Sequence, residues 1–314
     1  MSRNTPEYIR KRAGEGAAPR KGIRAVGFLG RLPAYRKHPA SLAAALATHL
    51  GAAVTVLVLG FLIVYILAKG IPNLKPEMFS PTYTSDNQSM LPAILNTCTM
   101  TLLSLLAAVP FGIGSAVYLA EYAPKGSGLV RLVRMTTETL QGIPSIVYGL
   151  FGKLLFSDAL HFGYSMLSGG LTMAIMILPL IMRTTEEALL CVPDMYREGS
   201  FGLGAGRLRT VMRIVLPTAV PGILSGIILA IGRIVGETAA LMYTSGTVAQ
   251  AAGLFDSGST LALHMYKQAS EGLYTRQAYA TSVVLLALVL VINFVSGRIA
   301  RWITKGRQTH DQQV

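Results

Sequence analysis

The sequence has little charge, and most of the charge that it has is positive. Only 14% of its 314 residues are Asp, Glu, Lys or Arg, against about a quarter in soluble domains. The 15 acidic residues face 28 basic ones, which gives a net charge of +13, and 52% of the residues are hydrophobic. This composition excludes a disordered chain and favours a protein whose hydrophobic segments lie in a membrane.

Cysteine is nearly absent, and the usual motifs of enzymes and metal sites are missing. Cys98 and Cys191 are too few for a disulfide framework and stand in no metal-ligand spacing. The five histidines are scattered, and the sequence has no hydrolase elbow, zinc motif or P-loop. We therefore predict that this chain holds no metal and no cofactor and catalyses no reaction.

Six stretches of low charge predict membrane helices, each of which needs about 20 residues. The third has the shortest uncharged run and contains Pro144. We include it because its charges lie near its ends, where long side chains can reach the interface, and because packed membrane helices tolerate proline. The predicted spans cover residues 42–68, 87–120, 132–157, 162–182, 221–243 and 277–297.

An even number of spans places both termini on one side of the membrane, and the basic residues decide which side. With cytoplasmic termini, the cytoplasmic segments carry 22 of the 28 Lys and Arg, the outer loops carry five, and Arg233 lies in the membrane. The positive-inside rule selects this orientation. The positive charge therefore indicates a membrane as partner and no nucleic acid.

The domain organisation follows from these spans and from the basic N-terminus. Residues 1–37 contain ten basic residues and no apolar period, which predicts a disordered cytoplasmic tail. We predict a tail over 1–42, a first helix and outer loop over 43–89, a core over 90–303 and a C-terminal cytoplasmic tail over 304–314.

One pair of charges lies inside a predicted span, in the run AIGRIVGETAAL. If the helix starts at Pro221, Arg233 lies about 18 Å along it, near the middle of a hydrocarbon core about 30 Å thick. Glu237 follows four residues later, on the same face. A charge at this depth faces a bundle interior or an aqueous path. The pair is therefore either a structural ion pair or part of an anion pathway.

As an anion site, this pair would select hydrogen phosphate. The fork of Arg233 can hold two oxygens of a tetrahedral oxyanion, whereas the carboxylate of Glu237 can accept a hydrogen bond only from a protonated substrate. Hydrogen phosphate carries a proton, and sulfate at neutral pH does not. Thr238 could donate or accept beside them. Glycines 222, 226, 232 and 236 have GxxxG spacing, which permits close helix packing in a gate or in a static bundle.

Two further features lie on the cytoplasmic side. Arg183 ends the fourth uncharged stretch and is interpreted either as an orientation anchor or as a residue of an exit path. The loop after it contains Gly204 and a later Pro217, which predict a helix, a glycine bend and a second helix stopped by the proline.

The loop EGSFGLGAGRLRTVMRIVLP resembles the segment with which permease subunits of ATP-binding-cassette (ABC) importers contact their ATPases. Two residues depart from the pattern, because Gly199 and Ser200 stand where the family has alanines. The matching residues are Glu198, Gly204, Ile214, Leu216 and Pro217.

Runs at 142–152, 177–199 and 229–241 are similar to the PstA family of phosphate transport permeases, and the resemblance covers about residues 90–303. It implies a type I ABC importer permease (MetI-like) fold in the bacterial inner membrane. It also implies Arg183, Arg233 and Glu237 as transport residues.

The resemblance implies three kinds of partner: the sister permease PstC, a PstB ATPase dimer that binds the ATP, and the phosphate-binding protein PstS. Three alternatives remain open at this point. They are a permease for another oxyanion such as molybdate or sulfate, a membrane enzyme acting on lipid phosphates, and a structural or regulatory subunit.

Overall fold

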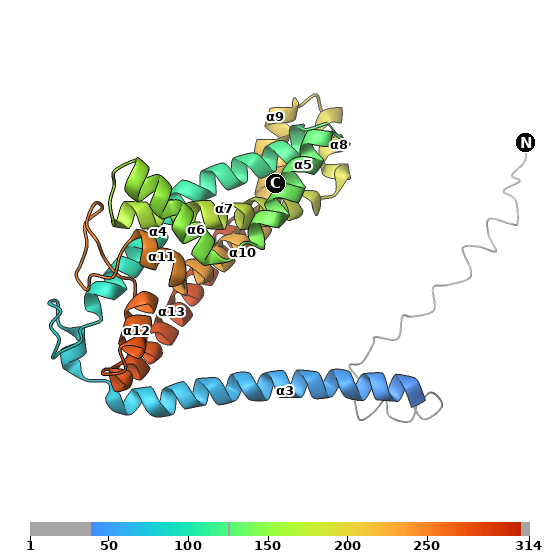
Figure 1. Cartoon of the computed structure of the whole chain (residues 1–314). Helices are drawn as coiled ribbons and strands as arrows, with labels where there is room; N and C mark the ends of the chain where they lie inside the picture. The colour runs from blue at the N-terminus through green and yellow to red at the C-terminus, as the bar shows by residue number, and fades with distance from the viewer. Residues whose placement is uncertain (1–38, 125, 309–314) are drawn as a thin grey trace, which may run out of the picture. The chain divides into compact units, whose positions relative to one another are not determined.

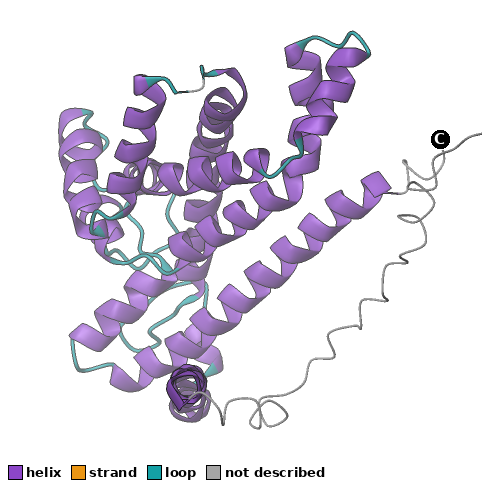
Figure 2. Ribbon diagram, turned by 90° about the vertical axis from the view of Figure 1, so that its right-hand side faces the viewer, coloured by secondary structure: helices purple, strands orange, loops and turns teal. Residues whose placement is uncertain are grey.

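The structure is a computed structural model that describes residues 39–124 and 126–308. Helices and loops make up this part of the chain, and no strand occurs in it (Figures 1 and 2). The predicted N-terminal tail up to residue 38 and the last six residues lie outside the described residues. The chain divides into two compact units, Met1–Ile63 and Val64–Val314.

The described part of the first unit is helical and belongs to α3 (Pro39–Gly70), which confirms the first predicted span. Its apolar side chains are exposed around the helix; Leu57, for example, is 71% exposed. A helix that is hydrophobic on all sides is stable only where other apolar groups surround it. In this helix that surrounding is provided by lipid or by other membrane helices.

Five continuous helical stretches within the described residues are long and apolar enough to cross a membrane. They confirm the first, second, fourth, fifth and sixth predicted spans, although the bounds of the fifth differ. The last four of these stretches are formed mainly by α4 (Leu91–Val117), α7 (Met166–Leu190), α10 (Leu216–Val235) and α13 (Thr275–Gln308).

The predicted third span is not one helix, and the count of six continuous spans is not confirmed. The segment forms α5 (Gly128–Gln141), α6 (Ser145–Gly152) and a π-helical stretch, Lys153–Ala159. Pro144 causes the break, because it cannot donate a hydrogen bond and disfavours a helical residue before it. The Tyr148 hydroxyl donates to the Leu140 carbonyl across the break, at 2.9 Å.

The broken segment still runs alongside α7 for much of its length. Arg134 of α5 contacts Glu186 of α7, and Gly152 at the end of α6 lies against Thr172. The distance from Glu186 to Thr172 along α7 is about 21 Å. The segment therefore packs along α7, although it is not among the helices that are long and apolar enough to cross a membrane.

The core of the second unit surrounds α7, which packs against α4, α6 and α10. Met173, Ile177 and Ile181 of α7 are almost completely buried. Small residues allow the close contacts: a β-carbon at Gly112 of α4 would overlap Ile181, and one at Gly170 of α7 would overlap Leu103. Such contacts between small residues are typical of helix packing in membranes.

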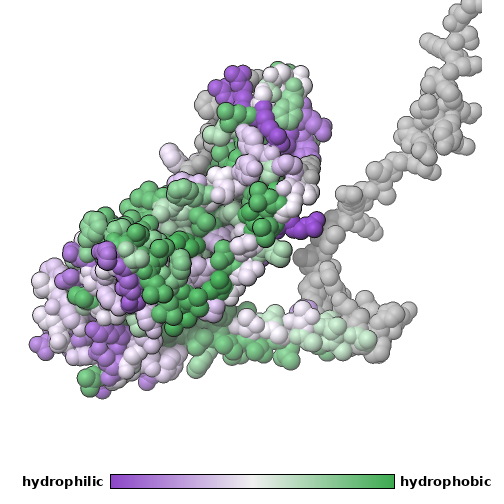
Figure 3. All heavy atoms as spheres, turned by 45° about the horizontal axis from the view of Figure 1, so that its top comes forward, coloured by the Kyte–Doolittle hydropathy of each residue, from purple (hydrophilic) through white to green (hydrophobic). Residues whose placement is uncertain are grey.

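The two ends of the second unit differ from its middle in hydrophobicity. α8 (Asp194–Gly202) and α9 (Arg207–Thr210) lie at one end, and α12 (Leu261–Ser270) lies at the other (Figure 1). On the face shown in Figure 3, hydrophobic residues form a band, and hydrophilic residues gather toward both ends. This distribution matches a bundle whose middle contacts lipid and whose ends contact water.

A close contact between α6 and α11 (Ala239–Thr244) provides a test of the packing. A β-carbon at Gly149 would lie 2.7 Å from the α-carbon of Ala240, and backbone cannot move aside as a side chain can. We expect Gly149→Val to cost about 1–3 kcal/mol and to lower the thermal unfolding midpoint of the detergent-purified protein. Gly114→Val is the control, because its β-carbon would meet open space; equal midpoints for the two variants would contradict the expectation.

Candidate functional site

The chain leaves the helical path two residues after Arg233. α10 ends at Val235, and α11 begins at Ala239, so the predicted helix through residue 243 is wrong in its second half. The reason is local: Gly236 weakens the helix, and the Glu237 carboxylate accepts a hydrogen bond from the Ala240 N–H, at 3.1 Å. Glu237 thereby satisfies one of the free donors at the start of the next helix.

Arg233 and Glu237 therefore do not form the predicted pair. No ion pair joins them, and Arg233 has no acidic partner within residues 39–124 and 126–308. Thr238 occupies the position before α11, where its carbonyl accepts from the Met242 N–H at 3.0 Å. The structure thus separates a free guanidinium from a carboxylate already engaged by backbone.

The start of the helix also differs from the prediction. The helical stretch begins at Arg207 rather than at Pro221. The start of the helix therefore does not give the depth of Arg233 in the membrane, whereas the packing of α10 against α7 does. β-carbons at Gly222 and Gly226 would overlap Ala188 and Thr184 of α7, respectively. In this antiparallel register Arg233 lies level with about residue 177, near the midpoint of α7.

Arg233 lines a cavity of about 580 Å³ whose walls come from α7, α10 and α13. Most of the wall is apolar, and its polar side chains are those of Arg233, Ser225 and Asn293. The Ser225 hydroxyl donates to the Pro221 carbonyl at 3.0 Å. The Asn293 side chain has no hydrogen-bond partner in the described part of the chain. The cavity therefore offers one free guanidinium and one free amide.

Asn293 was not a predicted site residue, although the sequence contains a signal for it. It is an amide within the otherwise apolar run LLALVLVINFV of the last span. A polar side chain in a membrane helix is costly unless it finds a partner. The structure places this amide, like Arg233, on the wall of one cavity.

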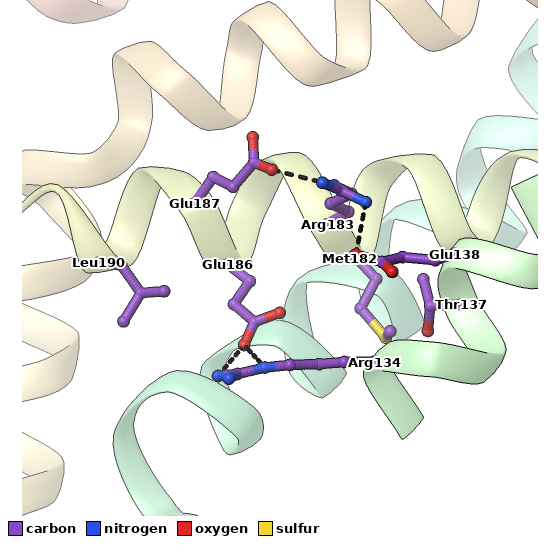
Figure 4. A pocket seen from close by; sticks show the side chains of 8 residues that line it. All are labelled: Arg134, Thr137, Glu138, Met182, Arg183, Glu186, Glu187 and Leu190. Atoms are coloured by element: carbon purple, nitrogen blue, oxygen red, sulfur yellow. Dashed lines mark hydrogen bonds and ion pairs between the residues drawn. The ribbon is translucent and has the colours of Figure 1, made fainter. Parts of the chain in front are cut away.

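Arg183 lies in a different cavity, of about 200 Å³, between α5 and α7 (Figure 4). Its Nη1 contacts Glu138 and its Nε contacts Glu187, each at 3.0 Å. In the same cavity Arg134 holds the mostly buried Glu186 through Nε, at 2.8 Å, and Nη2. Because two carboxylates already compensate the single charge of Arg183, this cavity attracts an anion less than an unpaired arginine would.

The loop between α7 and α10 contains the predicted glycine bend. Gly204 has a φ of +81°, and its N–H donates to the Phe201 carbonyl at 2.9 Å, while the Ala205 N–H donates to the Ser200 carbonyl at 3.1 Å. This pattern is a Schellman motif, which ends a helix at a residue with positive φ. Glu198 is exposed on α8, before the bend.

Pro217 does not stop a helix, contrary to the prediction. Ile214 lies in a π-helical turn, Val211–Val215, and Leu216 and Pro217 open α10, so helix continues from Arg207 to Val235. Proline cannot donate a hydrogen bond and crowds the preceding turn. A π-helical turn, which is wider than an α-helical one, lies directly before the proline.

Comparison with known proteins identifies the family. Residues 108–308 match the model of the family described as "Binding-protein-dependent transport system inner membrane component". The chain is 32% identical over 271 residues to the probable ABC transporter permease protein YqgI of Bacillus subtilis, which covers 80% of this chain and 90% of that protein. It is 33% identical over 232 residues to the phosphate transport system permease protein PstA of Xylella fastidiosa, over 72% of this chain and 80% of that protein.

The fold is also found in a solved transporter. A chain of the inward-facing MetNI methionine ABC transporter matches with a TM-score of 0.58 at 22% identity, over 68% of this chain and 96% of that one. This similarity confirms the predicted MetI-like fold. The family match covers more than half of the chain and includes α7, α10 and the loop between them. The chain therefore belongs to the binding-protein-dependent transport system inner membrane components, and it is a multi-pass permease subunit of an ATP-driven importer.

Proposed function

We propose that the protein conducts phosphate, as one of two permease subunits in a phosphate importer. The observation that carries this proposal is the free guanidinium of Arg233 on the wall of a cavity level with the middle of α7. An uncompensated arginine at that level attracts an anion, and its fork fits two oxygens of a tetrahedral one. The Xylella relative, a phosphate transport permease by name, supports phosphate as that anion.

In this proposal the chain supplies the pathway and leaves the chemistry to its partners. A PstB-type ATPase dimer binds and hydrolyses ATP next to residues 194–210, the segment of α8, the glycine bend and α9 that we call the α8–α9 loop. A PstC-type permease completes the pathway, and a PstS-type binding protein delivers phosphate from outside. Motion of the bundle exposes Arg233 first to one side and then to the other. Both termini lie in the cytoplasm, because the basic residues favour that side.

Uptake by the whole complex tests the proposal. The purified complex is reconstituted into vesicles with ATP on the ATPase side, and import of radiolabelled phosphate is measured with sulfate or molybdate as competitor. We expect ATP-dependent import that a tenfold excess of either competitor leaves unchanged. Import of sulfate or molybdate in place of phosphate would show that the substrate is another oxyanion.

Asn293 is the second polar group that the proposal places beside the anion. Its amide can donate to one phosphate oxygen and accept from the protonated one, the role first predicted for Glu237. Hydrogen bonds to charged groups contribute about 1.5–3 kcal/mol, so Asn293→Leu should lower phosphate uptake about tenfold or more.

The same cavity offers a matched control for this variant. Ser225 also lines it, but the hydroxyl of this residue bonds to its own helix. Ser225→Ala should therefore transport at the wild-type rate. Equal phosphate uptake by Asn293→Leu and Ser225→Ala would show that the amide of Asn293 does not bind the anion.

A further inference from the structure

Another arginine, Arg197, lies outside the cavities described above and joins the α8–α9 loop to the bundle. Arg197 of α8 contacts Glu121, which lies in a π-helical segment, Tyr118–Tyr122, at the end of α4. Arg197 Nη2 lies 2.7 Å from Glu121 Oε1, and Nε lies 3.2 and 3.3 Å from Oε1 and Oε2. The side chains are only 15% and 8% exposed, respectively. The carboxylate is thus held in a fork-like geometry away from water.

The same guanidinium also binds the end of α7. Arg197 Nη2 donates to the Leu189 carbonyl at 3.0 Å, and Nη1 donates to the Val192 carbonyl at 2.7 Å. Carbonyls at a helix end have no partner within the helix. A single side chain therefore connects α8 to α4 and to α7, and α4 and α7 pack closely against one another.

A second contact reaches the same place on α4. The guanidinium of Arg207 in α9 lies over the ring of Tyr122, 5.3 Å from its centroid. Within the loop, the hydroxyls of Ser200 and Thr210 bond at 2.8 Å and tie α8 to α9. The loop is therefore braced internally, and two of its arginines, Arg197 and Arg207, contact adjacent residues of one π-helical segment.

The Arg197–Glu121 pair is largely buried, and several hydrogen bonds join its two side chains. Hydrogen bonding to Glu121 raises the pKa of Arg197 above its ordinary value, so the arginine stays charged. Removing one partner of a buried pair leaves the other charge without compensation, which is strongly destabilising for the contact.

We infer that Arg197 and Glu121 are positioning residues for transport: they form the link through which movement of the α8–α9 loop reaches α4 and α7. The inference rests on the proposed function in one respect, namely that an ATPase moves this loop. When the link is intact, displacement of α8 carries the ends of α4 and α7 with it. When the link is cut, α8 moves against the bundle, and ATP hydrolysis no longer reorients the pathway.

The test measures ATP hydrolysis and substrate import in the same vesicles, with the complete complex. Glu121→Gln keeps the size of the side chain and removes its charge. We expect the amount of phosphate imported per ATP hydrolysed to fall at least tenfold, with subunits present in wild-type proportion. Asp194→Asn is the matched control: Asp194 also contacts Arg197, at 3.1 Å, but is 78% exposed, and this variant should keep the wild-type ratio.

The ratio separates a link from a residue that only supports folding. A folding role would lower hydrolysis and import together and leave the ratio unchanged, which would overturn the inference. If Glu121→Gln does not assemble, Glu121→Asp and Arg197→Lys, which keep the charges and lose the geometry, must lower the ratio; a wild-type ratio in both would overturn it too. A wild-type complex that imports another oxyanion would contradict the proposed substrate alone, and the ratio would then be measured with that anion.

Discussion

Arg233→Ala should reduce phosphate uptake at least thirtyfold while the subunit remains in the membrane with its partners. The reason is that Arg233 supplies the free positive charge of a largely apolar cavity. Losing one partner of a desolvated, hydrogen-bonded charge pair costs about 2–5 kcal/mol, and each 1.4 kcal/mol corresponds to about a factor of ten. Initial rates of radiolabelled phosphate import at limiting substrate measure the effect.

Arg233→Lys separates charge from geometry at the same position. Lysine keeps the positive charge but is a point donor that cannot hold two oxygens in a planar fork. We expect an intermediate loss, about tenfold, with most of the change in the substrate concentration required for half-maximal uptake. Arg301→Lys is the control, because Arg301 lies exposed on α13 and, among the residues that the structure describes, donates to its own helix at Gly297. Wild-type uptake by Arg233→Lys would show that the fork is not needed.

Gly204→Pro should reduce uptake to the background level by destroying the bend between α8 and α9. The φ of +81° at this residue is unavailable to proline, whose ring fixes φ near −65°. The substitution also removes the N–H that donates to Phe201, one of the two hydrogen bonds of the Schellman motif. Both losses fall on the α8–α9 loop, so the transmembrane bundle should still insert and fold.

Co-purification of the ATPase with tagged permease, followed by uptake, measures this second effect. We expect the ATPase to be lost from Gly204→Pro, or to remain bound without driving import. Gly206→Ala is a nearby control, since Gly206 has a φ of −73° and open space around it. ATP-driven import by Gly204→Pro at the rate of Gly206→Ala would exclude the bend from coupling.

Hydrophobic runs predicted five of the six spans as helices that are long and apolar enough to cross a membrane, because this property depends on length and composition alone. They could not predict where a helix breaks inside such a run. Gly236 ends α10 within the apolar stretch around it, and Pro144 divides the third segment, whereas Pro217 does not interrupt its helix at all. Whether a proline breaks a membrane helix depends on the turn before it and on its neighbours.

In the candidate site, too, composition predicts single residues, whereas contacts between distant residues require the structure. Arg233 could be predicted because one charge in an apolar run is visible in the sequence itself. The polar residue that shares its cavity could not be predicted in this way. Four-residue spacing suggested Glu237, but that carboxylate caps the next helix. The free amide that lines the same cavity belongs to Asn293, 60 positions away. Glu121 and Arg197 are 76 positions apart. Such neighbours are set by tertiary packing, of α10 against α13 in the first case and of α8 against the end of α4 in the second, which no local pattern records.

The crossing of α7 and α10 has a consequence for the depth of Arg233. Gly226 meets Thr184 and Gly222 meets Ala188 with no room for a further carbon atom. The volume at each crossing point is therefore shared between two positions, and a larger residue on one helix must be matched by a smaller one on the other. These two contacts define the register of α10 on α7, and they thereby set the level of Arg233 along α7.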